Sequence, residues 1–378
     1  MATEESWNLL KDEALRSTAQ GEAQGLGLKK GRYFKTDVVW TNALIFLVSH
    51  LVAVPAFYLW AFFRISWQTW LFSLALGLGS SQGILLGAHR YYTHRSYKAT
   101  LPLRVLIIFW NTIAIQNCLW EWARDHRQHH KHSDTDADPH NATRGFFFSH
   151  VGWLMMRKHP DVIAKGKDID MSDLESDPLI MFQKRHYLLL VLLLSVAMPI
   201  GVPMYFWNES FAVSFLVPFL LRTIIVLNFT WMVNSWAHAF GNKPYDKSIR
   251  PVESLLVALV SLGEGWHNYH HCFPWDYRAA ELSLGGFNPT TNVIHFFAWL
   301  GWAYDLKQAS DTVVAARVQR TGDGSHPSVA DTKTTTTTAK TSETESLDNT
   351  FPSTPLLRPG KHSCALWHSN VESTVICR

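Results

Sequence analysis

Residues 67–94, WQTWLFSLALGLGSSQGILLGAHRYYTH, join a long apolar run directly to two histidines, His89 and His94. The run up to Ala88 carries no charged side chain. It reaches the roughly 20 residues that a helix needs to cross the hydrocarbon core of a bilayer. Imidazole is the commonest metal ligand among protein side chains. The stretch therefore predicts a transmembrane helix, over residues 67–88, that leads into a metal-binding region.

Three other apolar runs are also long enough to span a bilayer, namely residues 38–63, 188–207 and 211–237. Only residues 64–66 and 208–210 separate the members of each consecutive pair. The four runs therefore predict two transmembrane helical hairpins with very short turns. Two shorter apolar segments, 101–116 and 252–262, are predicted to lie at the membrane interface.

The distribution of basic residues predicts which side of the membrane each loop occupies. The two hairpin turns contain a single basic residue, Arg64, whereas the long loop between the hairpins and the two ends contain most of the others. By the positive-inside rule, that loop and both termini are cytosolic. The opening residues are polar and show no signal peptide before the first span. All the histidine clusters described below then face the cytosol.

The amino-acid composition indicates which partners, compartment and domain organisation to expect. Charged residues make up 17% of the chain, and the net charge is +3, which gives no reason to expect a nucleic-acid partner. The four cysteines show no CxxC spacing, as expected in a reducing compartment. We expect a polar segment over residues 1–35 and one membrane-anchored domain over 36–320, with its metal-binding part at 89–187 and 238–320. A disordered Thr/Ser-rich tail is expected over 321–378.

Two further histidine clusters follow the first along the chain. One is His126-Arg-Gln-His129-His130 and the other is His267-Asn-Tyr-His270-His271. Positions i, i+3 and i+4 share one face of a helix, so each triad points one way and two facing triads can surround two metal ions. His89 and His94 are five residues apart and would diverge by about 140° on a regular helix. We therefore expect one of them to lie where the helix gives way to a loop.

The end of the fourth span supplies two more candidate ligands. Asn234 lies one helical turn before His238, so it can bind metal directly or hold a bound water. A structural zinc site usually has four ligands, often thiolates, so this many imidazoles suits two metals better. Imidazole alone does not decide between Fe, Zn, Cu and Ni. The remaining histidines in the core region are interpreted as ordinary buried or surface residues, namely His50, His132, His140, His150, His159, His186 and His295.

These motifs closely resemble the membrane acyl-CoA desaturase family, in particular the stearoyl-CoA (Δ9) desaturases of animals. The resemblance spans about residues 36–322. The matching stretches are Gly87–Lys98, Glu121–His130, Asp136–Asn141, Gly145–Trp153, Asn234–His238 and Gly263–His271. The pair Tyr91-Tyr92 departs from the Leu-Trp commonly found inside the first motif.

The resemblance implies an all-α integral membrane protein. Two transmembrane hairpins would be capped by a cytosolic helical domain carrying a histidine-rich dimetal site, in the endoplasmic reticulum membrane. It also implies an O2-dependent enzyme that inserts a cis Δ9 double bond into saturated long-chain acyl-CoA, for unsaturated fatty acid biosynthesis. The implied ligands of two iron ions are His89, His94, His126, His129, His130, His238, His267, His270 and His271, with Asn234 acting through a water.

Electrons for the implied reaction must come from another protein. The chain shows no His-Pro-Gly-Gly motif of a fused cytochrome b5 domain and no dinucleotide-binding fingerprint. The resemblance therefore implies separate cytochrome b5 with its NADH-dependent reductase. A basic cytosolic face would suit an acidic donor.

The same resemblance suggests residues that bind the substrate. Arg157 and Lys158 match the pair that holds the phosphates of CoA. Arg124 and Asp125 match positions near the adenine; alternatively, they orient metal-binding imidazoles. Positions near the acyl end are matched by Asn42, Asn117 and Trp231.

Two features of the spans leave their roles open. Gly79, Gly83 and Gly87 form a smooth stripe that either packs against another helix or lines an acyl tunnel. Arg222 lies inside the fourth span, where a charge is costly, so it either pairs with neighbouring groups or binds substrate.

Two other functions also have to be considered. Membrane hydroxylases and monooxygenases use similar histidine motifs, and the spacing does not show whether oxygen is transferred to the substrate. A metal transporter would place polar ligands within the spans, whereas His50 is the only histidine inside one. The first and third histidine motifs favour the desaturase.

Overall fold

The structure is a computed structural model that describes residues 36–281 and 286–329. The predicted polar segment 1–35 and most of the predicted tail, 330–378, lie outside the described residues. The described chain continues past residue 321, the predicted start of the tail. There His326 is buried and its imidazole packs edge-on against the ring of Tyr245.

Four helices are long and apolar enough to cross a membrane, as the sequence predicts, and their bounds are Trp40–Ala61, Trp67–Thr93, Pro178–Trp207 and Phe211–His238. The second continues beyond its predicted end at residue 88, and the third begins well before its predicted start at 188. Residues 89–93 and 178–187, assigned above to the cytosolic part, therefore belong to continuous helices. A span predicted only from apolar residues misses such polar helix ends, because polar residues continue a helix as readily as apolar ones.

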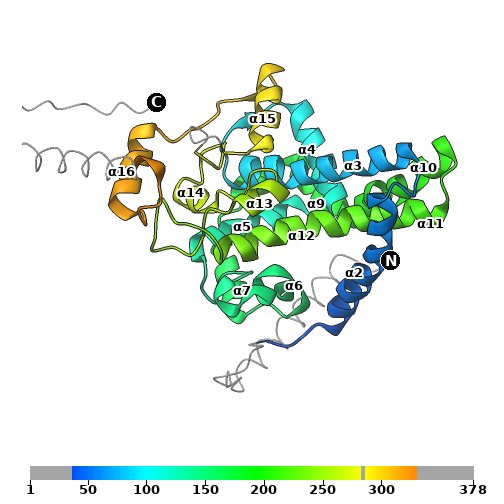
Figure 1. Ribbon diagram of the computed structural model, residues 1–378, viewed down its shortest axis with the longest axis horizontal. Coiled ribbons are helices and arrows are strands. Elements are labelled where there is room, and N and C mark those ends of the chain that lie inside the picture. The colour runs from blue at the N-terminus through cyan, green and yellow to red at the C-terminus, as the bar shows by residue number, and fades with distance from the viewer. Residues whose placement is uncertain (1–35, 282–285, 330–378) are drawn as a thin grey trace, which may run out of the picture. The chain divides into compact units, whose positions relative to one another are not determined.

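Most of these spans are composite helices (Figure 1). The first is α2 (Trp40–Ala61), and the second is α3 (Trp67–Gln82) followed by the π-helix η1 (Gly83–Thr93). The third is built from α9 (Pro178–Leu190), η4 (Val191–Ala197) and α10 (Met198–Trp207). The fourth consists of α11 (Phe211–Ser214), η5 (Phe215–Leu221), α12 (Arg222–Ser235) and the 3₁₀ turn η6 (Trp236–His238).

The rest of the described chain forms shorter elements. The helices are α4 (Leu101–Ala114), α5 (Leu119–His132), α6 (Trp153–Met155), α7 (Pro160–Gly166), α8 (Ser172–Glu175), α13 (Leu255–Val260), α14 (His267–Cys272), α15 (Pro289–Trp299) and α16 (Asp311–Thr321). Two shorter turns are η2 (Ala142–Arg144) and η3 (Phe148–Gly152). The strands β1 (Lys98–Ala99) and β2 (Ala303–Tyr304) pair antiparallel.

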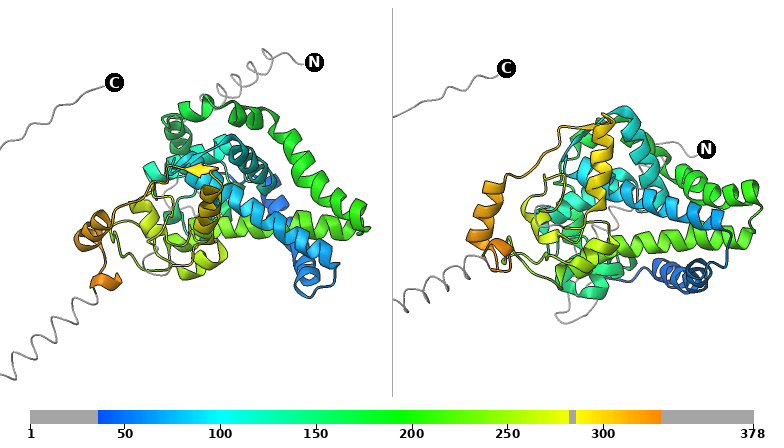
Figure 2. Two further views of the ribbon diagram at one scale, coloured as in Figure 1. Left: turned by 90° about the horizontal axis from the view of Figure 1, so that it is seen from above. Right: turned by 45° about the horizontal axis from the view of Figure 1, so that its top comes forward.

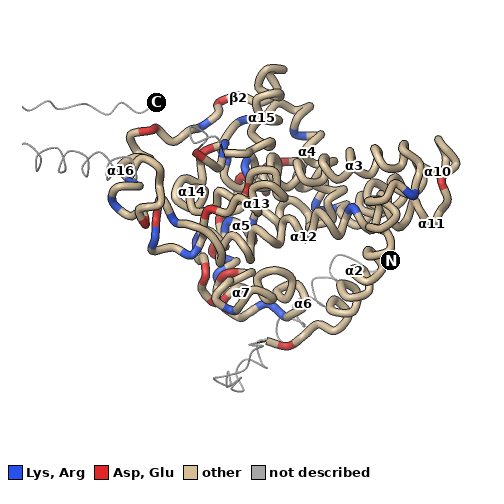
Figure 3. The backbone as a smooth tube through the Cα atoms, viewed as in Figure 1, with Lys and Arg blue, Asp and Glu red and all other residues tan. Residues whose placement is uncertain are grey.

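The turns of the two hairpins lie side by side. The carboxylate of Glu209, in the second turn, accepts hydrogen bonds from Ser66 Oγ in the first turn at 2.8 Å and from Thr69 Oγ1 at the start of α3 at 2.6 Å. Charged residues are sparse along α3, α10 and α12 and gather around α5, α7, α14 and α16 (Figure 3). The polar and apolar parts of the described chain are thus separated, as a membrane protein requires.

The two predicted interfacial helices are shorter than expected. The first is α4, which ends at Ala114, and α5 then leaves it at an angle of 83°. Ile115 and Asn117 adopt positive φ angles of 56° and 68° in the intervening turn. The second is α13, which covers only Leu255–Val260.

The glycine stripe of the second span packs against α4. A Cβ atom on Gly83 would lie 2.3 Å from the backbone nitrogen of Asn111, and one on Gly87 would lie 2.4 Å from Cγ2 of Ile107. Helix packing therefore accounts for the stripe. It draws η1, with its histidines, against α4, and α5 also contacts η1 (Figure 2).

Of the two roles considered for Arg222, the structure supports pairing with neighbouring groups. Its buried guanidinium donates to the Pro218 carbonyl at 3.1 Å, to Ser80 Oγ at 3.1 Å and to the Ile113 carbonyl. Ile113 lies in the last turn of α4, where carbonyl groups lack helical partners. Arg222 thus joins the fourth span to the second span and to α4.

Candidate metal centre

The π-helical end of the second span brings His89 and His94 together. The backbone N–H of His94 donates to the carbonyl of His89 at 3.2 Å, five residues back. Residues five apart therefore stack along η1 instead of diverging, and the two imidazole centroids lie 4.9 Å apart. His94 follows the last residue of η1, Thr93, so one of the two histidines lies where the helix gives way to a loop, as predicted, while the wider turn brings it beside His89.

The imidazoles gather into two groups whose ligand atoms lie within 4.8 Å of one another. The first group comprises His89, His94, His126, His130 and His270. The second group comprises His129, His238, His267 and His271. Helix α5 supplies His126, His129 and His130, whereas α14 supplies His267, His270 and His271. The two triads face each other as predicted, but each triad is divided between the two groups.

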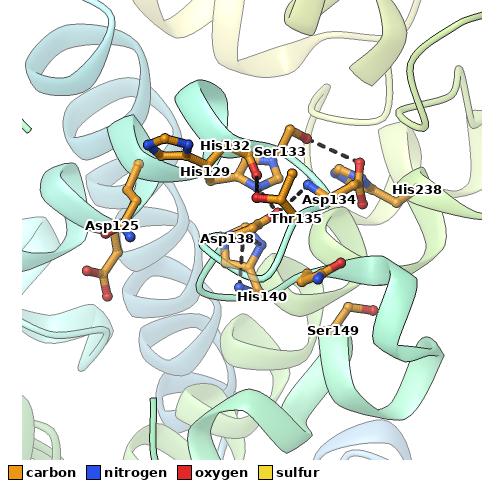
Figure 4. Close-up of polar contacts among 12 residues, drawn as sticks. Asp125, His129, His132, Ser133, Asp134, Thr135, Asp138, His140, Ser149 and His238 are labelled. Atoms are coloured by element: carbon orange, nitrogen blue, oxygen red, sulfur yellow. Dashed lines mark hydrogen bonds and ion pairs between the residues drawn. The ribbon is translucent and has the colours of Figure 1, made fainter. Parts of the chain in front are cut away.

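Three buried carboxylates orient imidazoles in these groups. Glu264 lies 2.9 Å from Nδ1 of His89, and Asp138 lies 2.9 Å from Nδ1 of His129. Asp134 lies 3.2 Å from Nδ1 of His238. Figure 4 shows Asp138 and Asp134 beside their imidazoles. In each pair Nδ1 carries the donated proton, so that Nε2 of the neutral ring is left with a lone pair.

The Nε2 atoms point at one another across each group. Nε2 of His89 lies 3.0 Å from Nε2 of His270, which lies 2.9 Å from Nε2 of His130. In the second group, Nε2 of His238 and Nε2 of His267 are 3.1 Å apart. Lone pairs that converge so closely repel unless a cation lies between them. The donor set therefore fits two transition-metal ions.

The electrostatic surroundings keep four of these rings neutral, whereas in His129 the Asp138 carboxylate outweighs burial and raises the pKa. Burial, reinforced by neighbouring histidines, holds the pKa of His126, His130, His270 and His271 well below the ordinary value. Burial alone would raise the pKa of Glu264, but Arg90 and His89 outweigh it and lower that pKa to about 2. These four rings can therefore bind metal at neutral pH, and Glu264 stays ionised beside His89.

Two other polar residues lie close to the groups. Asn234 is half-buried and lines a pocket together with His126. His140, interpreted above as an ordinary buried residue, has its ring centroid 4.3 Å from that of His129. Burial lowers the pKa of His140 to about 3, so it is neutral.

Two pockets meet at Asp125. One, of about 350 Å³, is mostly apolar, and Asn117, Trp231, Asn234 and His126 contribute to its wall. The other, of about 660 Å³, has a mixed lining that includes the cations Arg124 and Lys158, carboxylates and several apolar side chains. Asp125 lines both. The neighbouring pockets therefore combine an apolar chamber, which reaches the histidines, with a second one that contains both cations and carboxylates.

Some of the predicted substrate residues line the two pockets, and others do not. Arg124 Nη2 and Lys158 Nζ lie 2.7 Å and 2.8 Å from the Asp125 carboxylate, so Arg124 and Asp125 do not serve to orient imidazoles. Arg157 and Asn42 line neither pocket. The side chain of Asn42 instead donates to the carbonyl of Leu154 at 2.9 Å.

Sequence reasoning missed the three carboxylates that orient the imidazoles. Glu264 and Asp138 stand within motifs quoted above, three residues before His267 and two before His140. Acidic residues beside histidine clusters are a usable signal, because metal-binding imidazoles commonly donate their second N–H to a carboxylate. Asp134 lies outside those motifs.

Comparison with known proteins agrees with this geometry. The model of the fatty acid desaturase family matches residues 65–282. An acyl-CoA Δ9 desaturase of Acheta domesticus is 54% identical over 308 residues, which cover 81% of this chain and 86% of that protein. This chain belongs to the fatty acid desaturase family.

Other relatives are nearly as similar. An acyl-CoA Δ11 desaturase of Trichoplusia ni is 52% identical, covering 77% of this chain and 83% of its own length. An acyl-CoA Δ12 desaturase of Acheta domesticus is 52% identical, covering 79% of this chain and 85% of its own. Similarity at this level therefore does not distinguish one double-bond position from another.

Proposed function

We propose that this desaturase introduces a cis Δ9 double bond into saturated long-chain acyl-CoA, using two iron ions, O2 and two electrons. The observation that carries the proposal is the apolar pocket whose wall includes His126, a member of the first histidine group. That pocket adjoins the second pocket, which contains Arg124 and Lys158. An acyl chain and its anionic CoA head need these two environments next to each other.

The residues divide the work of holding the substrate. Lys158 and Arg124 would bind the charged part of CoA, with Asp125 fixing both cations at the junction of the pockets. The apolar pocket would hold the acyl chain and exclude water from the reacting carbons. Arg157 is exposed near Lys158 and is proposed as a second phosphate contact. Asn42, Asn117 and Trp231 are proposed to act near the acyl end.

The histidine groups would hold the metals. The nine imidazoles would bind two irons, and Asn234 would do so through a water. Bound iron would supply the activation of O2 and the removal of two hydrogens from the chain. Glu264, Asp138 and Asp134 would keep Nδ1 protonated in His89, His129 and His238 and so direct Nε2 toward metal.

The position of the double bond is the finer part of this proposal. The Δ9 assignment rests on the resemblance to stearoyl-CoA desaturases. Tyr91 and Tyr92, where this chain departs from that pattern, pack in or against the buried core with Tyr97 and line neither pocket. Their identity is therefore no direct obstacle to a Δ9 position.

The setting of the reaction is proposed on related grounds. The resemblance to animal stearoyl-CoA desaturases supports an endoplasmic reticulum membrane, and the four spans with their basic loops support a cytosolic position of both termini and the metal site. Cytochrome b5, reduced by its NADH-dependent reductase, would supply the electrons. Membrane lipid would surround the apolar faces of the spans.

Expression in yeast that lacks its own desaturase tests the proposed function. Fatty acids would be analysed by gas chromatography and mass spectrometry, with the double bond located by chemical derivatisation. We expect growth without added unsaturated fatty acid and accumulation of Δ9 products. Hydroxylated fatty acids in place of alkenes would favour the hydroxylase alternative. The absence of any new product, with folded protein and cytochrome b5 present, would overturn the proposal.

A further inference from the structure

A polar bridge crosses the apolar region between the first and fourth spans. Asn228 of α12 lies between two imidazoles, His50 of α2 and His150 of η3. Its side-chain nitrogen lies 3.0 Å from Nε2 of His50, and its side-chain oxygen lies 3.2 Å from Nε2 of His150. Polar side chains are costly among membrane helices and commonly have a function there.

The hydrogen bonds of the bridge run in one direction. His50 Nδ1 faces the carbonyl of Phe46 at 2.7 Å, so it must donate, and Nε2 of the neutral ring then accepts from Asn228. Asn228 also donates to the carbonyl of Ile224 at 2.8 Å, and its oxygen accepts from His150 Nε2. The amide of Asn228 is thus satisfied, because it donates to His50 and to Ile224 and accepts from His150.

The two imidazoles of the bridge flank the indole of Trp231. The ring centroid of His50 lies 6.2 Å from that of Trp231 in a stacked arrangement, and His150 meets the indole edge-on at 5.8 Å. Phe46 adds a third ring at 5.5 Å. Ser235 links His150 to the backbone of Trp231, since its hydroxyl lies 3.0 Å from His150 Nδ1 and donates to the carbonyl of Trp231 at 2.9 Å.

The indole is held on one side and faces the apolar pocket on another. Trp231 is only 2% exposed and lines that pocket together with Phe46. Within the described residues, the indole N–H of Trp231 makes no hydrogen bond, and neither does that of Trp153, which lines the same pocket. A group in the pocket can therefore meet this donor.

We propose that His50, Asn228 and His150 are positioning residues that fix the Trp231 indole and thereby set which methylene of the acyl chain lies beside the histidine groups. This inference rests on the proposed desaturase function. A Trp231 ring that tilts would shift the wall of the pocket, and the chain would slide along its axis relative to a metal site that stays in place. The predicted consequence is a change in double-bond position.

The alternative is that the bridge only fastens α2 to the bundle. Most of α2 is not covered by the rest of the protein, since only 11% of its most apolar 18-residue stretch is buried. A fastening role predicts less folded protein after mutation but the same product from the molecules that remain. Product distribution therefore separates the two roles, because it does not depend on the amount of enzyme.

The decisive variants are Asn228→Leu, which removes the hydrogen bonds of Asn228 to both imidazoles and to Ile224, and His50→Phe, which keeps an aromatic ring beside Trp231. The matched control is Ser214→Ala, in the same span, where the buried hydroxyl makes no hydrogen bond. Each would be expressed in desaturase-deficient yeast, and double-bond isomers and chain lengths would be quantified by mass spectrometry. We expect an approximately fivefold change in the isomer or chain-length ratio for Asn228→Leu, equivalent to about 1 kcal/mol.

Every outcome bears on the proposal. A smaller shift in the same direction for His50→Phe, with the wild-type ratio in Ser214→Ala, supports it. Wild-type ratios in both bridge variants, at any total yield, would overturn it. So would complete loss of product in both variants while the protein remains in the membrane and binds acyl-CoA. Failure of the wild-type chain to make any alkene would instead refute the proposed function on which the inference rests.

Discussion

Oε2 of Glu264 lies 2.9 Å from Nδ1 of His89, while its second oxygen lies 2.6 Å from Nη2 of Arg90. Arg90 is therefore neutralised where it is buried, and the tautomer of the adjacent His89 is fixed at the same time. One carboxylate thus serves both the stability of the fold and the direction of a metal ligand.

Replacing Glu264 by Gln is expected to lower metal affinity by about 10- to 100-fold, as for other residues that orient metal ligands. It also leaves the buried Arg90 without a charged partner, which costs roughly 3–5 kcal/mol. Metal content and thermal unfolding of the purified protein would check both effects. Asp305→Asn is the control, since Asp305 pairs with Lys98 at the surface. Equal metal content in the two variants would contradict the role of Glu264.

Single histidine substitutions should distinguish the two metal groups. His129→Ala removes a ligand of the second group only, whereas the first group keeps its five imidazoles. We expect activity to be abolished and the metal content to fall by about one ion per chain, since each ion has its own ligands. Plasma mass spectrometry of purified protein measures this. Retained activity would mean that His129 is not a ligand.

The second span should tolerate no side chain at Gly83. A Cβ there would lie 2.3 Å from the backbone of Asn111, whereas at Gly201 of the third span no atom of a neighbour lies within 4 Å. Gly83→Ala is therefore expected to destabilise the protein by at least the ~1–3 kcal/mol typical of overpacking. Gly201→Ala should leave the thermal midpoint nearly unchanged. Similar midpoints for the two variants would contradict the close approach of η1 to α4.

Metal-free protein should lose stability on acidification. The ordinary pKa of histidine is about 6.5, and burial holds the pKa of His126, His130, His270 and His271 well below it. Below that pH the unfolded chain takes up protons that the folded chain does not, so the free energy of unfolding falls with pH. Thermal midpoints of chelator-treated protein should decrease from about pH 7 to pH 5 and change little above pH 7. A midpoint that rises on acidification would show that the rings are not buried and neutral.

The sequence was sufficient to predict the four spans, the two facing triads and the family. These features depend on local composition and on the regular spacing of α-helices. It was insufficient for the geometry of His89 and His94, because a π-helix is rare and places residues five apart on one side. The division of each triad between two groups depends on how α5, α14 and η1 pack. No local pattern contains that information.

His50 and His126 also differ in how far the sequence alone identifies their roles. Both are single imidazoles in helices, yet one belongs to a hydrogen-bonded bridge and the other to a metal group. The spacing of histidines along one helix identified the second residue. The partner of His50 in the bridge, Asn228, lies 178 residues away along the chain, and Asn228 in turn bonds His150; only the folded structure brings the three residues together.

The central claim is that two imidazole groups hold two metals that serve an acyl-CoA desaturase. Its most direct test is the iron content per chain of the purified protein, measured together with alkene formation from saturated acyl-CoA in the presence of reduced cytochrome b5. We expect about two irons per chain, with activity that is lost on iron removal and restored by iron. Alkene formation by protein that contains less than about one transition metal per chain would contradict it.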